Sequence, residues 1–538
     1  MKRQKSFFIL LLIIPALTGT AIHDTGRMWP LLPVGFLLFG LVYIAALIKT
    51  EFSWSASVGG LLGGVLLIVH AVLLPSSFTG RDPSWFFIAA QKIVETGSTD
   101  MIYVGFYESI SGFPIYLSEL ILIFDDPSRV PIILAIMVLI SLPLAVGYFA
   151  QVISPGRVSV TLGIFFAVVG QSSFKFAMVP IAQTLHVVTI AISAGLVVKY
   201  DRQSDLRYGF LLLIFLIFWS SIHKLPLVML LGSLVGIVGL RLVFQTVQSN
   251  RKLVWDDLPI NLIAIVATLI AVQQTILTGY VVSRAVTVFT VAQDFGFVTS
   301  VAGDVPDLGV LSVFSTVSNV RVLVIGASLA SIVLFHRLRS RRTLSALGFV
   351  GGAIGIAVVA AIAWVPVTRV LGSLTPLLIT VIAGALSYFY SGNLSMKSAA
   401  TGFIIILIIT QAFTAGLVLD DPRTPRRYLD EEEAGSKMWI ESFVTDHVYA
   451  DSQYVLSILP GRLSDVTIMS KTSLRHGEYG LFRVPRTTDD LQNEPVVKRD
   501  ISLYFYGWIH QFYEEKPMFV NDRNVIYDSG SVSVSSPP

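Results

Sequence analysis

Acidic and basic side chains stand together at the start of one segment, GRDPSWFFIAAQKIVETG, which covers residues 80–97. Arg81 and Asp82 come directly after a long apolar run, and a second carboxylate, Glu108, follows the segment. A carboxylate in such a position can take a proton from a hydroxyl group and stabilise positive charge that develops during a reaction. Asp82 is therefore the first candidate for a catalytic residue.

Asp82 also suits a purely structural role. Asp is a favoured N-cap, Pro83 fits the first helical position, and Gly97 fits the residue just past a helix end. The two roles are compatible, because a capping carboxylate keeps one oxygen free, although amide donors would lower its pKa and weaken it as a base. The apolar residues form one stripe, which predicts that residues 84–96 lie on the bilayer surface with Ser84 on the polar face.

Further cations stand at the ends of apolar runs. His223 and Lys224 lie in the short turn WSSIHKLP, and Arg369 lies in WVPVTRVLGSLTP. A Lys at a helix end either reaches the lipid headgroups or binds one anionic headgroup. A guanidinium there either anchors the helix at the interface or forks onto a phosphate group with two parallel hydrogen bonds. Both alternatives stay open for these residues.

The elements that must carry these residues are membrane helices. Of the 538 residues, 54% are hydrophobic and only 14% are charged, which indicates an integral membrane protein. The net charge of +3 is spread over short loops and gives no case for nucleic-acid binding. The chain has no cysteine and no motif for ATP hydrolysis or zinc chemistry, so we expect neither a metal nor another cofactor.

Thirteen apolar runs are candidates for membrane spans. We interpret the first, after MKRQK, as a retained helix rather than a cleaved signal peptide, because comparable runs follow it closely. The spans are expected at residues 7–22, 29–48, 57–74, 130–150, 158–170, 180–198, 208–222, 225–240, 259–277, 310–335, 344–364, 371–390 and 398–419.

The basic loops assign the two sides of the membrane. Lys and Arg concentrate in cytoplasmic loops, and the four strongest basic loops fall on one side only if the apolar run 110–124 lies along the interface. The expected fold is thus an all-α polytopic protein of the cell membrane with a cytoplasmic N-terminus. Residues 1–419 form its transmembrane catalytic domain, with external loops at 75–129 and 278–315. Short alternating runs predict an extracellular α+β or mostly β domain at 420–538.

These features resemble the GT-C superfamily, membrane glycosyltransferases that use polyprenyl-phosphate sugars. The segment 80–97 followed by GFPIYL is similar to the acidic loop motif of that family, and SKMWIESFVTDHVYAD (436–451) is similar to the start of the external domain in archaeal members. The chain departs from the family in two respects. Its acidic loop follows the third span instead of the first, and the external turn QSSFKFAMVPIAQ contains no second acidic residue.

The resemblance implies the transfer of a hexose, with mannose as the first choice, from dolichyl or polyprenyl phosphate to a glycan on a lipid or protein. The reaction would belong to protein N-glycosylation at the external face, with Asp82 as the catalytic carboxylate and Glu108 in place of the second acidic residue. The partners would be the lipid-linked donor, the glycan acceptor and membrane lipids. The residues expected to bind the lipid phosphate of the donor are Arg369, Lys224, His223 and Arg81.

A second function remains open, a flippase or transporter of polyprenyl-linked saccharides. Such a protein would have a similar number of spans and basic headgroup contacts. It would favour charges that line a central cavity within the helices, and it has little use for a large external domain.

Overall fold

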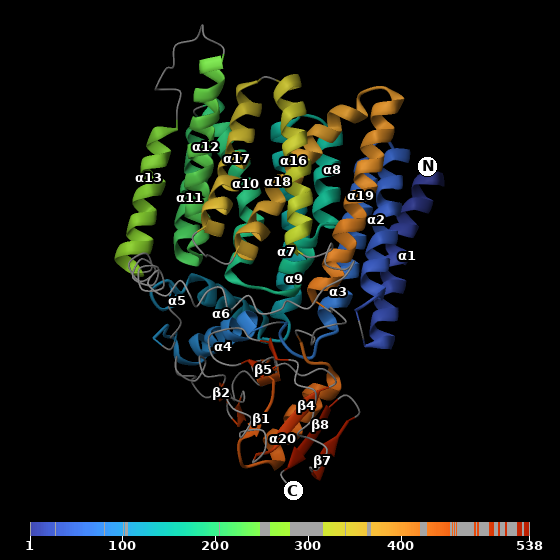
Figure 1. The fold of residues 1–538 in the computed structure, drawn as a ribbon, viewed down its shortest axis with the longest axis vertical. Coiled ribbons are helices and arrows are strands. Elements are labelled where there is room, and N and C mark those ends of the chain that lie inside the picture. The colour runs from blue at the N-terminus through green and yellow to red at the C-terminus, as the bar shows by residue number, and fades with distance from the viewer. Residues whose placement is uncertain are drawn as a thin grey trace.

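The computed structural model describes most of the helical part of the chain and separate stretches of the C-terminal part (Figure 1). The described residues are 2–26, 28–79, 81–100, 102, 106–203, 205–247, 259–279, 316–338, 340–362, 367–419, 428–451, 454–455, 457, 459, 478–479, 481–483, 494–499, 504–505, 512–513, 524–529 and 532–536. Most of the predicted loop 278–315 lies outside them.

A bundle of long helices makes up the larger part of the molecule (Figure 1). These helices are α1 (Lys2–Thr25), α2 (Leu31–Lys49), α3 (Trp54–Leu73), α7 (Val130–Ile153), α8 (Arg157–Val168), α9 (Gln171–Met178), α10 (Ala182–Gln203), α11 (Leu206–Ile222), α12 (Leu225–Val247), α13 (Ile260–Ala271), α16 (Thr316–Leu338), α17 (Arg341–Ile362), α18 (Val367–Tyr390) and α19 (Leu394–Leu419). A π-helix, η2 (Val272–Leu277), continues α13. Three short helices, α4 (Arg81–Thr96), α5 (Phe106–Ser109) and α6 (Gly112–Phe124), lie across one end of the bundle.

The predicted polytopic fold is confirmed. Eleven helices in the described part are long and apolar enough to cross a membrane, and α8 with α9, bent by 48° at Gly170, makes a twelfth. The remaining expected span coincides with α11, an apolar helix of 17 residues. The run 110–124 forms only the 13-residue α6 and lies across the bundle end. The protein is therefore a multi-pass membrane protein.

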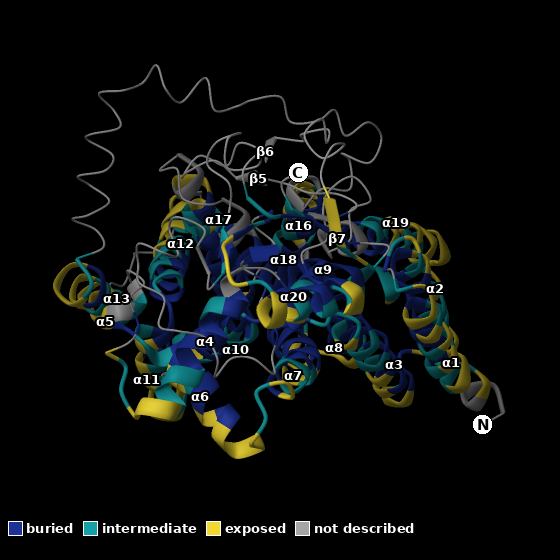
Figure 2. Ribbon diagram, turned by 90° about the horizontal axis from the view of Figure 1, so that it is seen from below, coloured by how far each residue is buried: buried dark blue, intermediate teal, exposed yellow. Residues whose placement is uncertain are grey.

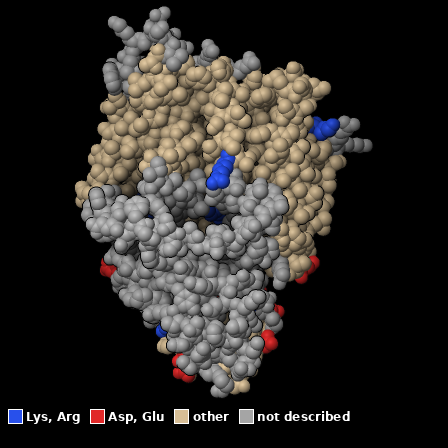
Figure 3. Space-filling view, viewed as in Figure 1, with Lys and Arg blue, Asp and Glu red and all other residues tan. Residues whose placement is uncertain are grey.

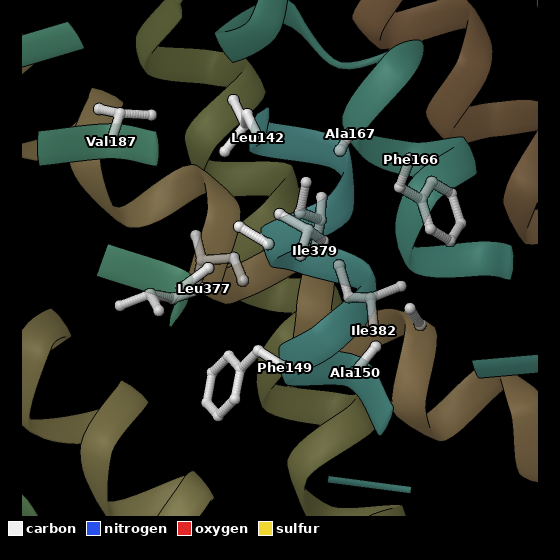
Figure 4. Close-up of a cluster of buried hydrophobic side chains, with 14 of the residues drawn as sticks. Leu142, Phe149, Ala150, Phe166, Ala167, Val187, Leu377, Ile379 and Ile382 are labelled. Carbon is white, nitrogen blue, oxygen red and sulfur yellow. The ribbon is translucent and has the colours of Figure 1, made fainter. Parts of the chain in front are cut away.

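The bundle presents apolar side chains outward and packs others inward. Figure 2 shows exposed residues on the outer faces of α1, α2 and α19, while α9 and α18 are buried in the centre. The helical part of the face drawn in Figure 3 is almost entirely uncharged, as helices that meet lipid require. In the interior, Leu142 and Phe149 of α7, Phe166 of α8, Val187 of α10 and Ile379 of α18 belong to one buried cluster (Figure 4).

Two glycine pairs let α12 and α17 approach each other backbone to backbone. Gly232 and Gly236 on α12 face Gly348 and Gly352 on α17, and each pair has the small-xxx-small spacing. A Cβ atom on Gly236 would lie 2.2 Å from the carbonyl oxygen of Gly348, and one on Gly352 would lie 2.0 Å from that of Gly232. No larger residue fits at these positions without separating the helices.

The two ends of the bundle differ in what they carry. One end, the sheet end, bears α4, α5 and α6 and faces the C-terminal part of the chain (Figure 1). The opposite end, the N-terminal end, contains the start of α1 and the ends of α10, α12 and α16, after which the predicted basic loops follow in the sequence. There the buried carboxylate of Asp201 forms ion pairs with Arg241 and, at 3.8 Å, with Arg341.

The described stretches from 428 to 536, the C-terminal sheet region, pack one helix against a mixed sheet. Helix α20 (Glu431–Phe443) precedes β1 (Val448–Tyr449). The sheet also contains β2 (Glu478–Tyr479), β3 (Phe482–Arg483), β4 (Val496–Arg499), β7 (Asn524–Asp528) and β8 (Val532–Ser536), in the order β2-β3-β1-β4-β8-β7. Strand β1 runs parallel to β3 and β4, and the other pairs are antiparallel. A separate antiparallel pair joins β5 (Tyr504–Phe505) and β6 (Phe512–Tyr513).

Buried charges connect α20 to the sheet. The Arg499 side chain on β4 is 2% exposed, and its Nε donates to Glu433 Oε1 at 2.6 Å while its Nη1 donates to Asp451 Oδ1 at 3.2 Å. Glu433 also accepts from the backbone N–H of Asp430 and so closes the capping box at the start of α20. The same carboxylate thus fixes the helix end and its contact with the sheet.

Lys437 makes the stability of this region depend on pH. Burial lowers its pKa from 10.5 to about 7, an effect larger than the opposing one of the nearby Glu441 and Asp451 carboxylates. Between about pH 7 and pH 9 the unfolded chain keeps a proton on Lys437 that the folded region releases, so this group stabilises the region as the pH rises. We expect the urea midpoint of unfolding to rise less with pH in Lys437→Met than in the wild type. Equal pH dependence in the two proteins would contradict this assignment.

Candidate functional site

The helix that carries Asp82 begins two residues earlier than the sequence predicts. Helix α4 starts at Arg81, so Asp82 is its second residue and not its N-cap. The side chains of both residues lie outside the described part. Gly97 ends the helix as expected, with φ at +68° and its N–H donating to the carbonyl of Ile93 at 2.8 Å. A carboxylate in the first turn still benefits from the helix dipole.

The prediction that Ser84 lies on an outward-facing polar side of α4 is wrong. Ser84 is only 1% exposed, and the stretch Phe86 to Ala90 is buried on every side of the helix. Only the last turn keeps the expected polar face, where Lys92 Nζ bonds Glu95 Oε2 at 2.6 Å. The apolar stripe in the sequence identifies the face of α4 that packs inward. It gives no indication that other segments also cover the opposite, polar face of the helix.

Aromatic rings hold α4 in place. Phe87 stacks on Phe78 with ring centroids 4.2 Å apart. Phe86 meets Phe113 of α6 edge to face at 4.8 Å and Tyr107 of α5 at 4.9 Å. Such aromatic pairs add to the free energy of burial and restrict the orientation of the helix. The start of α4 therefore stands on a rigid base.

Glu108, the second predicted carboxylate, lies in the one-turn helix α5 beside Tyr107, and its side chain is outside the described part. Two described titratable groups of the 75–129 segment have shifted pKa values. Burial and the Glu119 carboxylate raise the pKa of Tyr116. Hydrogen bonds from Ser128 lower the pKa of Asp126. Neither change makes a general base suited to neutral pH, because a tyrosine with a raised pKa stays protonated and a carboxylate with a lowered pKa is a weak base.

The turn between α11 and α12 contains His223 and Lys224 and touches α6. A Cβ atom on Gly112, the first residue of α6, would lie 2.2 Å from the carbonyl oxygen of Ser221, so the two backbones are in direct contact. His223 is 4% exposed, and its Nδ1 accepts a hydrogen bond from the N–H of Leu225 at 3.2 Å. An Nδ1 that accepts places the ring hydrogen on Nε2, so His223 is a neutral donor and not a cation. The remaining cation of this turn is Lys224.

The π-helix η2 fixes this turn from the other side. Gln273 Nε2 donates to the carbonyls of Ser220 and His223 at 2.8 and 3.3 Å, and Gln274 Nε2 donates to that of Lys224 at 2.8 Å. π-helical turns inside longer helices occur frequently at functional sites. The sequence signal for this support was a pair of adjacent glutamines in an apolar run. No role was predicted for them.

We expect Gln273→Leu to loosen the His223–Lys224 turn. The buried carbonyl oxygen of His223 and the part-buried one of Ser220 would lose their side-chain donor, which costs about 1–3 kcal/mol. The thermal unfolding midpoint in detergent should fall, whereas Ile276→Ala, at a 73% exposed position of the same π-helix, should leave it nearly unchanged. Equal midpoints for the two variants would show that Gln273 does not support the turn.

Arg369 lies in the first turn of α18 at the sheet end, and its side chain is outside the described part. The helix turn that follows it is fixed to its neighbours. Gln183 Nε2 of α10 donates to Ser373 Oγ at 2.7 Å, and Gly372 lies against Phe176 of α9. The start of α18 therefore packs against α9 and the start of α10.

Three buried amide side chains form a network that sequence reasoning missed. Asn319 of α16 donates to Gln171 Oε1 at 2.8 Å, and Gln411 of α19 donates to Asn319 Oδ1 at 2.5 Å. Gln411 Oε1 also accepts the backbone N–H of Gln171, the first residue of α9 after the break in the span. Polar residues inside membrane helices were the available signal. The network holds the bent α9 against two later helices.

The C-terminal sheet region is attached directly beside the start of α4. Ser76 donates its N–H to the carbonyl of Leu429 at 2.9 Å, and the N–H of Leu429 donates to Ser77 Oγ at 2.8 Å. Ser77 and Leu429 are both buried. Figure 2 views the molecule from this side, with α20 in front of the bundle.

The structure thus brings several segments that carry candidate residues to the sheet end of the bundle. Residues of α4 and α6, the starts of α7 and α10, and Ile222, the last residue of α11 before the His223–Lys224 turn, share one buried apolar cluster. Within the described residues, no group of three His, Asp or Glu side chains lies close enough to hold a metal ion. The side chains of Asp82 and Glu108 are not covered by that observation.

Comparisons with known proteins add little to this geometry. No protein-family model matches the sequence, and no curated protein matches it significantly. Two solved structures of the Archaeoglobus fulgidus oligosaccharyltransferase are similar to the chain. The complex with zinc and sulfate has 12% identity and a TM-score of 0.45 over 82% of this chain and 67% of that one. The apo form has 11% identity and a TM-score of 0.44 over 91% and 69%. A likeness at this level carries no argument about the activity of this chain.

Proposed function

We propose that the protein is a membrane glycosyltransferase that moves one hexose from a polyprenyl phosphate to a glycan on a lipid or protein. Mannose on dolichyl phosphate is the preferred donor, and the sheet end is the external face where the acceptor arrives. The proposal includes the division into a transmembrane catalytic domain at 1–419 and an extracellular domain at 420–538. It rests on the resemblance of residues 80–97 to the acidic loop motif of the GT-C superfamily and on the geometry of the sheet end.

The observation that carries the proposal is the shared apolar cluster at the sheet end. It connects α4, which bears Asp82, to α6 and to Ile222, the last residue of α11 before the His223–Lys224 turn. The C-terminal sheet region is bonded to the chain just before α4 through Ser77 and Leu429. A reaction at a membrane surface needs such rigid supports, because a catalytic carboxylate must be held within a fraction of an ångström of its productive position.

In the proposed reaction the oxygen of an acceptor hydroxyl attacks the anomeric carbon of the donor. The bond from that carbon to the phosphate oxygen breaks, and the polyprenyl phosphate leaves with the electron pair. Asp82 takes the hydroxyl proton and stabilises positive charge on the sugar ring, with Glu108 as the second carboxylate. Arg369, Lys224 and Arg81 hold the departing phosphate, and His223 contributes a neutral N–H donor. A single displacement of this kind inverts the anomeric configuration.

Reconstituted wild-type protein separates this function from lipid translocation. Proteoliposomes receive a polyprenyl phosphate that carries a labelled hexose, together with an acceptor glycan, and the label is followed in the acceptor and across the bilayer. We expect label in the acceptor only when the protein is present. Label that crosses the bilayer without reaching the acceptor would replace the proposal with the flippase alternative.

A further inference from the structure

A second polar site lies at the N-terminal end of the bundle, opposite the site proposed above. It is a cavity of about 250 Å³ between the last turns of α7 and α10 and the first turn of α17. The charged and polar residues that line it are Gln151, Lys199, Arg202, Gln203 and Arg342. Of the described residues that line the cavity, three are cations and none is acidic. The cavity therefore carries a concentrated positive charge.

Neutral groups hold two of these cations in place. The Arg342 guanidinium donates to the carbonyl oxygens of Gln151 and Val152, in the last turn of α7. The Lys199 ammonium lies 4.9 Å from the ring centroid of Tyr148 and 5.5 Å from that of Tyr208. Carbonyl oxygens and aromatic rings orient a cation without cancelling its net charge. The charge of both side chains thus remains available to an anion.

The nearest described carboxylate on α10 is committed elsewhere. Asp201 is paired with Arg241 and Arg341 and accepts a hydrogen bond from Ser345 Oγ at 2.7 Å. Its side chain is 4% exposed, and Asp201 does not line the cavity. Two separate electrostatic units therefore stand side by side at this end. One is a buried ion-pair cluster, and the other is a cavity lined by three cations, in which the charges of Arg202 and Arg342 repel each other.

We propose that this cavity binds a phosphate group. Two guanidinium groups can fork onto phosphate oxygens, and the Lys199 ammonium adds a point charge. The phosphate belongs either to the headgroup of an anionic lipid or to free inorganic phosphate, and both have the same chemistry at this site. Basic pockets between membrane helices on the side of the basic loops are a common setting for anionic headgroups. The site is independent of the proposed sugar transfer.

The test compares the two sources with one set of variants. Purified protein is placed in phosphatidylcholine nanodiscs with or without phosphatidic acid, and retained lipid is counted by native mass spectrometry. Inorganic phosphate is titrated by calorimetry into the nanodiscs without phosphatidic acid. The double variant Lys199→Gln with Arg202→Gln leaves Arg342 and its contacts to α7 intact. Arg207→Gln removes an exposed cation from the following helix and serves as the matched control.

The wild type should retain phosphatidic acid or bind inorganic phosphate, and the responding arm identifies the source. Each lost cation should weaken binding by about tenfold, and Arg207→Gln should bind as the wild type does. Arg202→Lys, which keeps the charge, should recover most of the binding lost in Arg202→Gln. Wild-type affinity in the double variant, or binding of neither phosphate source by the wild type, would overturn the proposal.

Discussion

Replacing Asp82 with asparagine should lower the rate of sugar transfer by about 10²–10⁴-fold, the usual contribution of a general base. The substitution keeps the size of the side chain and removes only its charge and basicity. In the first turn of α4 a lost carboxylate costs the helix about 1 kcal/mol at most, so the protein should still insert and fold. Initial rates with a polyprenyl-phosphate hexose donor, measured beside the thermal unfolding midpoint, separate the two effects.

The same segment provides the control for this substitution. Asp100 is exposed, lies just past the end of α4 and is not a proposed site residue. Asp100→Asn should transfer sugar at the wild-type rate. If Asp82→Asn also keeps that rate while the protein is active, Asp82 is not the base and its role is confined to the helix start.

Replacing Arg499 with methionine should destabilise the C-terminal sheet region by about 3–5 kcal/mol, because it leaves two carboxylates buried without their cation. Glu433 and Asp451 are 2% and 0% exposed in their side chains, so neither can reach water in the folded region. Protease cleavage of the sheet region in increasing urea measures the loss of stability.

A compensated variant makes this prediction sharper. Adding Glu433→Gln and Asp451→Asn to Arg499→Met removes the uncompensated charges, and part of the lost stability should return. An exposed charge on the same helix supplies the control, since Glu431→Gln should change stability by no more than about 0.5 kcal/mol. A sheet region that tolerates Arg499→Met would mean that the buried ion pairs contribute nothing to its stability.

The hydropathy of the sequence predicts the positions of the membrane helices well. Local sequence patterns predict less of how these helices bend and pack. Apolar runs have only one stable solution in lipid, so each expected span coincides with a helix. The bend at Gly170 was missed because the residues after it, QSSFKF, read as a polar turn, whereas the structure buries them as α9 through the amides of Asn319 and Gln411. Such partners lie more than a hundred residues away, and one sequence gives no signal for them.

The candidate site shows the same division. Gly97 predicts where α4 ends, because backbone conformation is a local property, whereas Pro83 places the start of the helix two residues too late. The burial of Ser84 depends on surfaces that other segments bring to α4, and the amphipathic pattern describes only the helix itself. The neutral state of His223 likewise depends on the N–H of Leu225, a contact that exists only in the folded turn.

The most direct test of the account measures both products of one reaction. Purified protein in proteoliposomes is given a polyprenyl-phosphate hexose and an acceptor glycan, and mass spectrometry quantifies the lipid and the glycan together. The account predicts equal amounts of free polyprenyl phosphate and of glycan lengthened by one hexose. An intact donor, or polyprenyl phosphate released with free sugar and an unchanged glycan, would contradict it.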